Sequence, residues 1–313
     1  MNRGEKKPDF IICGAMKTGT TTLHHLLDQQ DAFFLPNCEV HYFCAGDLSQ
    51  HFPYRGRSSS RWYRQSYGGD ELKQWYSSHF DQAKEGQLIG EDSTVYMASS
   101  LAPARIRDAL PDVKLIFVLR NPVDRLWSHY WHLVRSGRAM YGLDRMLEIQ
   151  ASSLLVRGHY KEQIERYKLL FPENQLKFIL LEDIKSKPHA IVSEIAQWLG
   201  HPLGVEGAHF TQTHFHRGRY PRSLRMQLWR NRLLQGLDRR LYQNHYPEVI
   251  EVSDLPTSVL HRLIEKLFIK VNPHDGVSST LDHSTREMLG AYYCEQNNGL
   301  GELIGRAEVD LWH

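Results

Sequence analysis

Long hydrophobic runs and paired cysteines are what this sequence most clearly lacks. No stretch approaches the roughly 20 apolar residues that a membrane-spanning helix requires. The opening residues, MNRGEKKPDF, have no apolar signal core, so we expect a cytoplasmic protein without a membrane partner. The few cysteines show neither metal-ligand spacing nor a disulfide framework, and we expect them to be buried thiols. They are Cys13, Cys38, Cys44 and Cys294.

A strong excess of charge of either sign is also missing. The net charge of +2 is too small to favour a nucleic-acid partner. Basic residues do gather locally, because six arginines lie between positions 217 and 232. Histidine is abundant, but the histidine pairs lack carboxylate or cysteine neighbours at ligand spacing. We therefore expect no metal site.

Short apolar runs alternate with amphipathic segments along most of the chain. This alternation predicts an α/β fold in which helices flank both faces of a central parallel sheet. We expect a single domain over residues 1–313, with a long loop at 44–69 and a mostly helical portion at 222–313. Strands are predicted at 9–14, 33–36, 88–93, 114–119 and 177–181, and helices at 20–29, 71–80, 103–110, 143–156, 160–170 and 187–199. A further helix should begin at Pro122, with Asn121 as its N-cap.

The segment GAMKTGTTTL joins the first predicted strand to the first predicted helix. Glycines let the backbone approach a ligand, and the helix N-terminus favours an anion. A loop that binds a nucleotide triphosphate would place lysine directly after the second glycine, yet Thr20 occupies that position and Lys17 comes earlier. The residues of this loop that we expect to bind the anion are Lys17, Thr18, Gly19, Thr20 and Thr21.

This loop resembles the 5′-phosphosulfate loop of the sulfotransferases, which take a sulfuryl group from 3′-phosphoadenosine 5′-phosphosulfate (PAPS). The resemblance implies a P-loop-like three-layer fold, and it implies that Lys17 contacts the 5′-phosphate and the oxygen bridging to sulfur, without a metal. In that family an arginine at a strand end and a serine eight residues later hold the 3′-phosphate. Arg120 and Ser128 in LRNPVDRLWS have this spacing.

A later segment, HFHRGRYPRS, is similar to the basic loop of the heparan-sulfate branch of the family. The likeness implies that this loop closes over the phosphates of PAPS or of the product 3′,5′-adenosine bisphosphate (PAP). The residues concerned are Arg217, Gly218, Arg219 and Tyr220. The three matches occur in order between residues 9 and about 221, as in the heparan-sulfate and bacterial members.

The acceptor side is expected around CEVHYF, which resembles the Glu-x-His-Phe-Phe segment of glycan sulfotransferases. The resemblance implies that Glu39 is the general base. His41 is the alternative, because the ordinary pKa of histidine suits this task. The segment GEDSTVY is similar to the family's acceptor-lining segment, but Asp92 stands where several glycan-acting members have lysine. That difference favours a neutral or cationic acceptor over a heavily sulfated polymer.

The sequence thus predicts a sulfotransferase that moves a sulfuryl group from PAPS to a hydroxyl or amine of a small-molecule or carbohydrate acceptor by in-line displacement. Two other hypotheses remain open. One is a magnesium-dependent P-loop kinase or nucleotide hydrolase, and the other is a nucleotide-binding module without catalysis. Neither the acceptor nor the oligomeric state follows from the sequence.

Overall fold

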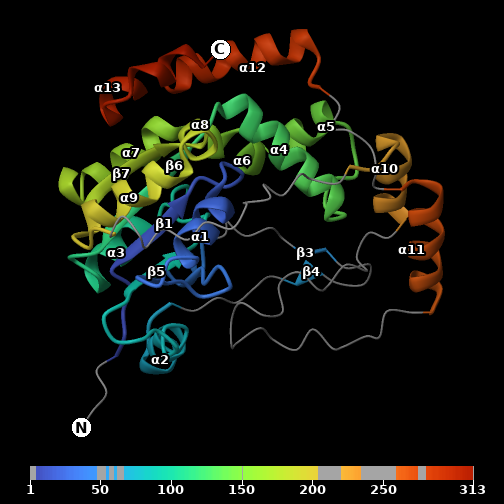
Figure 1. Cartoon of the computed structure of the whole chain (residues 1–313). Helices are drawn as coiled ribbons and strands as arrows, with labels where there is room; N and C mark the ends of the chain where they lie inside the picture. The colour runs from blue at the N-terminus through green and yellow to red at the C-terminus, as the bar shows by residue number, and fades with distance from the viewer. Residues whose placement is uncertain are drawn as a thin grey trace.

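A five-stranded parallel sheet forms the centre of the molecule (Figure 1). The computed structural model describes residues 5–47, 54–55, 60–61, 67–149, 151–203, 220–233, 259–273 and 280–312. The strand order is β2-β5-β1-β6-β7, and every pair in this sheet is parallel. The strands are β1 (Phe10–Gly14), β2 (Phe33–Phe34), β5 (Leu88–Asp92), β6 (Lys114–Leu119) and β7 (Leu176–Leu180).

The two central strands, β1 and β6, are buried along almost their whole length, as expected for strands covered on both faces. Successive side chains point to opposite sides of the sheet. Ile11 and Phe117 therefore join one core, whereas Ile12 and Ile116 join the other. This arrangement confirms the predicted α/β fold with three layers.

Helices cover each face of the sheet through these two cores. On one side lie α1 (Thr20–Asp28), α8 (Leu181–Ser186) and α9 (Pro188–Leu199). On the other side lie α2 (Asp70–Ser78), α3 (Ala102–Ala109) and α7 (Tyr160–Lys168), with α13 (Leu300–Ile304) and the 3₁₀ turn η5 (Ala307–Leu311).

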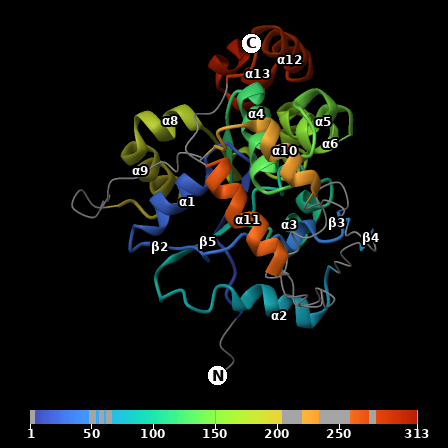
Figure 2. The ribbon, with the colours of Figure 1, turned by 90° about the vertical axis from the view of Figure 1, so that its right-hand side faces the viewer.

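Helix α4 (Pro122–Arg135) starts as the sequence predicts and organises a third core. The Asn121 side chain accepts hydrogen bonds from the backbone N–H groups of Val123 and Asp124, at 2.9 and 3.3 Å. The apolar face of α4 packs against helices that come later in the chain. These are α5 (Leu143–Ile149), α6 (Ala151–Leu154), α10 (Leu224–Leu233) and α12 (His283–Gln296), and α11 (Val259–Val271) lies beside α10 (Figure 2).

Several predicted boundaries differ from the structure. Within the helix predicted at 143–156, α5 and α6 are helical, but the end of the span is the 3₁₀ turn η2 (Val156–Gly158). The strand expected at 177–181 ends at Leu180, because α8 begins at the next residue. Within 44–69, where we expected a loop, β3 (Tyr54–Arg55) pairs antiparallel with β4 (Ser60–Arg61).

The structure also tests the expected burial of the cysteines and the expected lack of membrane-spanning helices. Cys13 and Cys44 are buried as expected, but Cys38 and Cys294 are exposed, so the expectation of four buried thiols was wrong for two of them. None of the helices in the described parts of the chain has the length and apolar character to cross a membrane.

Candidate active site

The loops that follow β1 and β6 leave the sheet at the same edge. These strands are parallel neighbours, and the N–H of Ala15 donates to the carbonyl of Val118 at 2.9 Å. The loop that carries Lys17 therefore begins beside the loop that carries Arg120. The carboxyl edge of a parallel sheet is where open α/β folds bind their ligands.

Two glycines allow the first loop to adopt its path. Gly14 and Gly19 have φ angles of 131° and 95°, which favour glycine. A Cβ at Gly14 would lie 2.5 Å from the Thr94 carbonyl oxygen, and one at Gly19 would lie 2.5 Å from Cδ1 of Leu181. Gly14 is thus required on steric grounds as well, because the Thr94 carbonyl belongs to the backbone, whereas Gly19 is favoured by its φ angle.

The N-terminus of α1 opens onto this loop. Gly19 is its N-cap, and no side chain of the described residues caps the helix. The first N–H groups of a helix have no partner within it, so they are suited to an anion. Thr18 is fully buried, and its hydroxyl donates to the Ala15 carbonyl at 2.6 Å. That hydroxyl shapes the loop, while Thr20 is buried and Thr21 is exposed at the start of the helix.

Lys17 sits among cationic groups of α4 and the turn that follows it. It adopts a left-handed backbone conformation, with φ 70°. Burial, and then the guanidinium of Arg135, lowers the pKa of Lys17; Glu39 opposes this shift and Arg138 adds to it. Burial and the charges of Lys17, Arg138 and Arg135 likewise lower the pKa of His132 to about 3, so this imidazole is neutral.

Arg120 lies between β6 and α4, Ser128 lies within α4, and both are partly exposed. The Arg120 guanidinium is 4.0 Å from Asp124, a long distance for an ion pair. The other oxygen of Asp124 accepts a hydrogen bond from Arg286 at 2.7 Å. Asp124 is therefore shared, and Arg120 has guanidinium donors to offer a phosphate.

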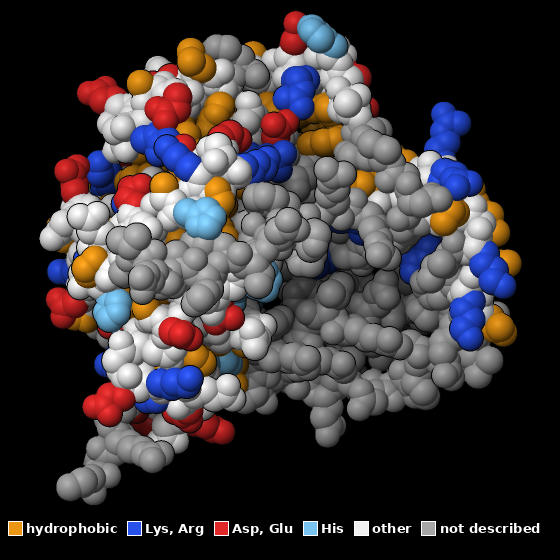
Figure 3. Space-filling model, in the orientation of Figure 1, with side chains coloured by type: hydrophobic (Ala, Val, Ile, Leu, Met, Phe, Trp, Pro, Cys, Tyr) orange, Lys and Arg blue, Asp and Glu red, His pale blue; other side chains and the backbone are white. Residues whose placement is uncertain are grey.

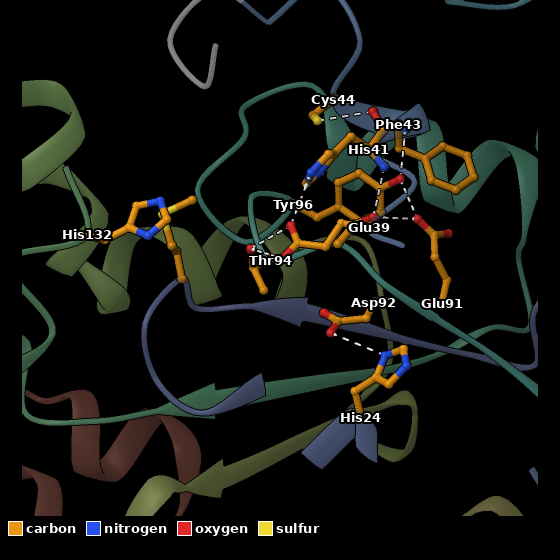
Figure 4. Close-up of polar contacts among 12 residues, drawn as sticks. His24, Glu39, His41, Phe43, Cys44, Glu91, Asp92, Thr94, Tyr96 and His132 are labelled. Carbon is orange, nitrogen blue, oxygen red and sulfur yellow. Dashed lines mark hydrogen bonds and ion pairs between the residues drawn. The ribbon is translucent and has the colours of Figure 1, made fainter. Parts of the chain in front are cut away.

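Glu39 and His41 form a pair that faces Thr94 (Figure 4). The His41 Nε2 atom is 3.1 Å from Glu39 Oε2, and the Thr94 hydroxyl donates to the same oxygen at 2.9 Å. Burial alone would raise the pKa of Glu39, but the hydrogen bonds and charge of His41 and the bonds from Thr94 lower it below its ordinary value. Burial would lower the pKa of His41, yet its contacts with Cys44 and Glu39 raise it to about 10.

A second glutamate, Glu91, supports this pair from the protein interior. It is fully buried and accepts hydrogen bonds from the hydroxyls of Tyr76 and Tyr96, each at 2.6 Å, and from Ser93 at 2.8 Å. Ser93 Oγ accepts from the His41 N–H at 2.9 Å, and the Tyr96 hydroxyl oxygen accepts from the Phe43 N–H at 3.1 Å. Glu91 thus fixes the backbone that carries His41, which has a φ of 57°.

Comparison with known proteins identifies the family. A family model described as a sulfotransferase domain matches residues 7–220. The chain belongs to the sulfotransferase family. The family match agrees with the sequence resemblance and favours sulfuryl transfer over the chemistry of a kinase or nucleotide hydrolase.

Two human proteins illustrate the similarity of this sulfotransferase to curated relatives. The bifunctional heparan sulfate N-deacetylase/N-sulfotransferase 2 is 25% identical over 211 residues, which cover 63% of this chain and 22% of that protein. The heparan sulfate glucosamine 3-O-sulfotransferase 6 is 27% identical over 210 residues, which cover 65% of this chain and 55% of that protein. The match therefore spans only part of either relative.

A solved structure shows the same fold over nearly the whole chain. The sulfotransferase from Alicyclobacillus acidocaldarius superposes with a TM-score of 0.65 and covers 96% of this chain and 97% of its own. Its sequence identity is 23%, so the likeness extends to the fold alone.

Asp92 takes an unexpected place in this sulfotransferase. It is 5% exposed, and one of its oxygens lies 3.6 Å from Nδ1 of His24 in α1 (Figure 4). Burial raises the pKa of Asp92 to about 6. Because this carboxylate is buried against His24, it gives weaker support for a cationic acceptor than its sequence position suggested.

The late basic loop is described only at its end. Arg217, Gly218 and Arg219 lie outside the described residues. The ring of Tyr220 packs edge-on against Trp131 with centroids 5.1 Å apart, and the Arg135 guanidinium lies 5.3 Å from its centre. Tyr220 is thus placed beside α4, next to a guanidinium that also influences Lys17.

Four residues near the candidate site escaped the sequence analysis. Thr94 was noted only as part of an acceptor-lining segment, and its hydrogen bond to Glu39 depends on the fold. His132 and Arg135 had a signal that was available, because positions 128, 132 and 135 recur at helical spacing on α4. Arg138 lies beyond the end of the helix, so this spacing does not include it. Among the described residues, no group of three potential ligands is arranged to hold a metal ion.

Proposed function

We propose that this sulfotransferase transfers a sulfuryl group from PAPS to a hydroxyl or amine of a small-molecule or carbohydrate acceptor, releases PAP and requires no metal. The observation that carries this proposal is the group of cations around the uncapped N-terminus of α1. The pKa of Lys17 is lowered by burial and by Arg135. Repulsion among these cations is relieved when an anion binds between them.

The residues present fit both ends of the donor. Lys17 and the loop amides of Thr18, Gly19, Thr20 and Thr21 would hold the 5′-phosphosulfate. Arg120, at the neighbouring strand end, and Ser128, in α4, would hold the 3′-phosphate. Arg217, Gly218, Arg219 and Tyr220 would close over the phosphates. When bound, PAPS supplies the sulfuryl group and a phosphate leaving group, and Lys17 would stabilise the charge that develops on that phosphate.

Glu39 is the proposed general base. Its lowered pKa keeps the carboxylate ionised at neutral pH, whereas the raised pKa of His41 keeps the imidazole protonated. A protonated imidazole cannot accept the acceptor's proton. His41 instead orients Glu39 through the 3.1 Å contact, and Thr94 holds the same carboxylate from the other side.

The charged side chains near Lys17 also indicate which charge the acceptor carries. Arg135 and Arg138 influence Lys17 and His132, and Glu39 is the acidic group that opposes their effect on both pKa values. Asp92, by contrast, is buried against His24. This distribution suits an acceptor that carries an anionic group near the atom to be sulfated, in preference to a cationic acceptor.

The proposal is tested first by ligand preference. PAP should raise the melting temperature, and Lys17→Ala and Arg120→Ala should each remove that rise. Lys7→Ala should not, because Lys7 is exposed and precedes the opposite end of β1 from the loop. Labelled PAPS with a broad acceptor panel should then give sulfated product without added magnesium. Stabilisation by ATP with magnesium but not by PAP would favour a kinase or hydrolase. Binding of PAP without turnover on any acceptor would favour a binding module.

A further inference from the structure

Helices α10 and α11 form a unit on one side of the molecule (Figure 2). The rings of Trp229 and Phe268 lie 5.6 Å apart. At the ends of these helices the Ser223 N–H donates to the Asn272 side chain at 2.7 Å, and that side chain donates back to the Ser223 carbonyl at 2.9 Å. The two helices therefore present a joint outer surface.

This surface exposes a row of large apolar side chains. Leu263, Leu267 and Val271 of α11 are 59%, 61% and 56% exposed. Their spacing of four residues places them on one side of the helix. Trp229 of α10, which is 55% exposed, extends the row across the helix contact. Four large apolar groups so exposed on neighbouring helices are a feature of interaction surfaces.

Basic side chains border the apolar row. Lys266 and Lys270 are exposed on α11 and lie beside Leu263 and Leu267 on the helix circumference. Arg225 is exposed on α10, one turn before Trp229. The sequences of the two helices contain a single acidic residue, Glu265. We call the apolar row and its three basic neighbours the α10–α11 face, and blue and orange side chains alternate along the corresponding edge in Figure 3.

The α10–α11 face is held firmly on the sulfotransferase core. The Asn231 side chain is buried and donates to the carbonyls of Val134 and Ala139, at 2.8 and 2.7 Å. Arg232 donates to the Met140 carbonyl at 2.7 Å. Whatever binds this face is thereby fixed relative to the end of α4.

We propose that the α10–α11 face docks the protein on the surface of an anionic lipid bilayer. Apolar side chains enter the boundary between headgroups and acyl chains, and flanking lysines and arginines attract anionic headgroups. A second copy of the chain is a poorer occupant, because a two-fold interface would bring the same lysines against one another. The exposure that supports this proposal depends on the fold, so the sequence alone gave no reason to expect a membrane partner.

The proposal concerns peripheral binding and is independent of the proposed sulfuryl transfer. The full chain should co-sediment with vesicles of phosphatidylcholine and phosphatidylglycerol, and much less with phosphatidylcholine alone. Leu263→Gln/Leu267→Gln and Lys266→Glu/Lys270→Glu should each weaken this binding at least about tenfold. High salt should weaken it as well, because the lipid charge is screened.

Matched control variants distinguish binding through the α10–α11 face from nonspecific binding to vesicles. Leu169→Gln/Leu311→Gln removes two apolar side chains that are 84% and 71% exposed elsewhere. Lys7→Glu/Lys185→Glu makes the same charge change at other exposed positions. Both should bind vesicles as the unaltered protein does, and PAP should stabilise all four variants equally.

Three outcomes overturn the proposal. The first is no binding of the unaltered chain to anionic vesicles, and the second is equal loss in the control variants. The third is a dimer in light scattering that Leu263→Gln/Leu267→Gln converts to a monomer, because the apolar row would then be covered by a second copy.

Discussion

Glu39 and Glu91 stand on two sides of the same short segment, yet their surroundings are opposite. Glu39 is partly open to solvent and contacts His41 and Thr94, and its pKa is lowered. Glu91 is fully buried among the hydroxyls of Tyr76, Tyr96 and Ser93, and burial raises its pKa. One carboxylate is placed to meet a ligand, and the other is enclosed by the protein.

We infer from this difference in surroundings that one residue type takes two roles within the candidate site. A carboxylate with a cationic partner and open space stays ionised and can accept a proton from an acceptor. A carboxylate surrounded by hydroxyl donors instead fixes the segments that carry those donors. The hydrogen bonds around each group therefore assign the roles, and each role has its own test.

The largest effect is expected for Glu39→Gln. The amide keeps the shape of the side chain but cannot accept the acceptor's proton. Turnover should fall at least about 100-fold, which is the usual contribution of a positioned base. Single-turnover assays with labelled PAPS would measure this loss. PAP binding should be unchanged by calorimetry, and near-normal turnover would remove Glu39 from the role and transfer it to His41.

For Glu91→Leu we expect a loss of stability. The change leaves the hydroxyls of Tyr76, Tyr96 and Ser93 without their shared acceptor in a buried place. The free energy of unfolding should fall by about 3 kcal/mol, because each buried group left unsatisfied costs about 1–3 kcal/mol. Denaturant titration would measure it. If Glu91→Leu were as stable as the original chain, the supporting role of Glu91 would be lost.

Thr94→Val should have a smaller effect on the rate. The substitution preserves size but removes the hydroxyl that donates to Glu39. A hydrogen bond to a charged group contributes about 1.5–3 kcal/mol, and the lower end of this range corresponds to a fall in kcat of about tenfold. Thr94→Ser is the matched control, since it retains the hydroxyl. An equal loss in both variants would show that the hydroxyl is unimportant.

The pH dependence distinguishes the two members of the Glu39–His41 pair. With a hydroxyl acceptor, a Glu39 base gives a constant kcat/KM across neutral pH, because the lowered pKa keeps Glu39 ionised. At alkaline pH the rate should fall as Lys17, whose pKa is also lowered, loses its proton. A His41 base would instead make the rate rise towards pH 10, because His41 releases its proton at about that pH.

Much of the fold follows from local sequence signals. The run KLIFVL predicts β6 with its observed bounds, and Asn121 and Pro122 mark the start of α4. The boundary between β7 and α8 was missed because residues 178–181 of KFILLEDI are all apolar and run from the strand into the helix. Leu180, the N-cap residue, gives no capping signal. The 3₁₀ turn that ends the span predicted at 143–156 likewise has no glycine or proline to announce it within that span.

The candidate site was less accessible to sequence reasoning than the fold. Lys17, Arg120 and Glu39 were identified through motifs, and their proposed roles remain to be tested. The pairing of Asp92 with His24 joins residues on β5 and α1, and no local pattern predicts it. The effect of Arg135 on the pKa of Lys17 also depends on where the fold places the end of α4.

Lys17 and His41 are the two residues other than glycine that adopt positive φ among the described parts of the chain. A left-handed backbone costs an ordinary residue about 1–2 kcal/mol, and glycine adopts it freely. Engineering for heat resistance would therefore favour glycine at both positions, and each gain would remove a side chain from the candidate active site. A thermostable variant selected without an activity assay would therefore tend to keep the fold and lose these two side chains of the candidate site.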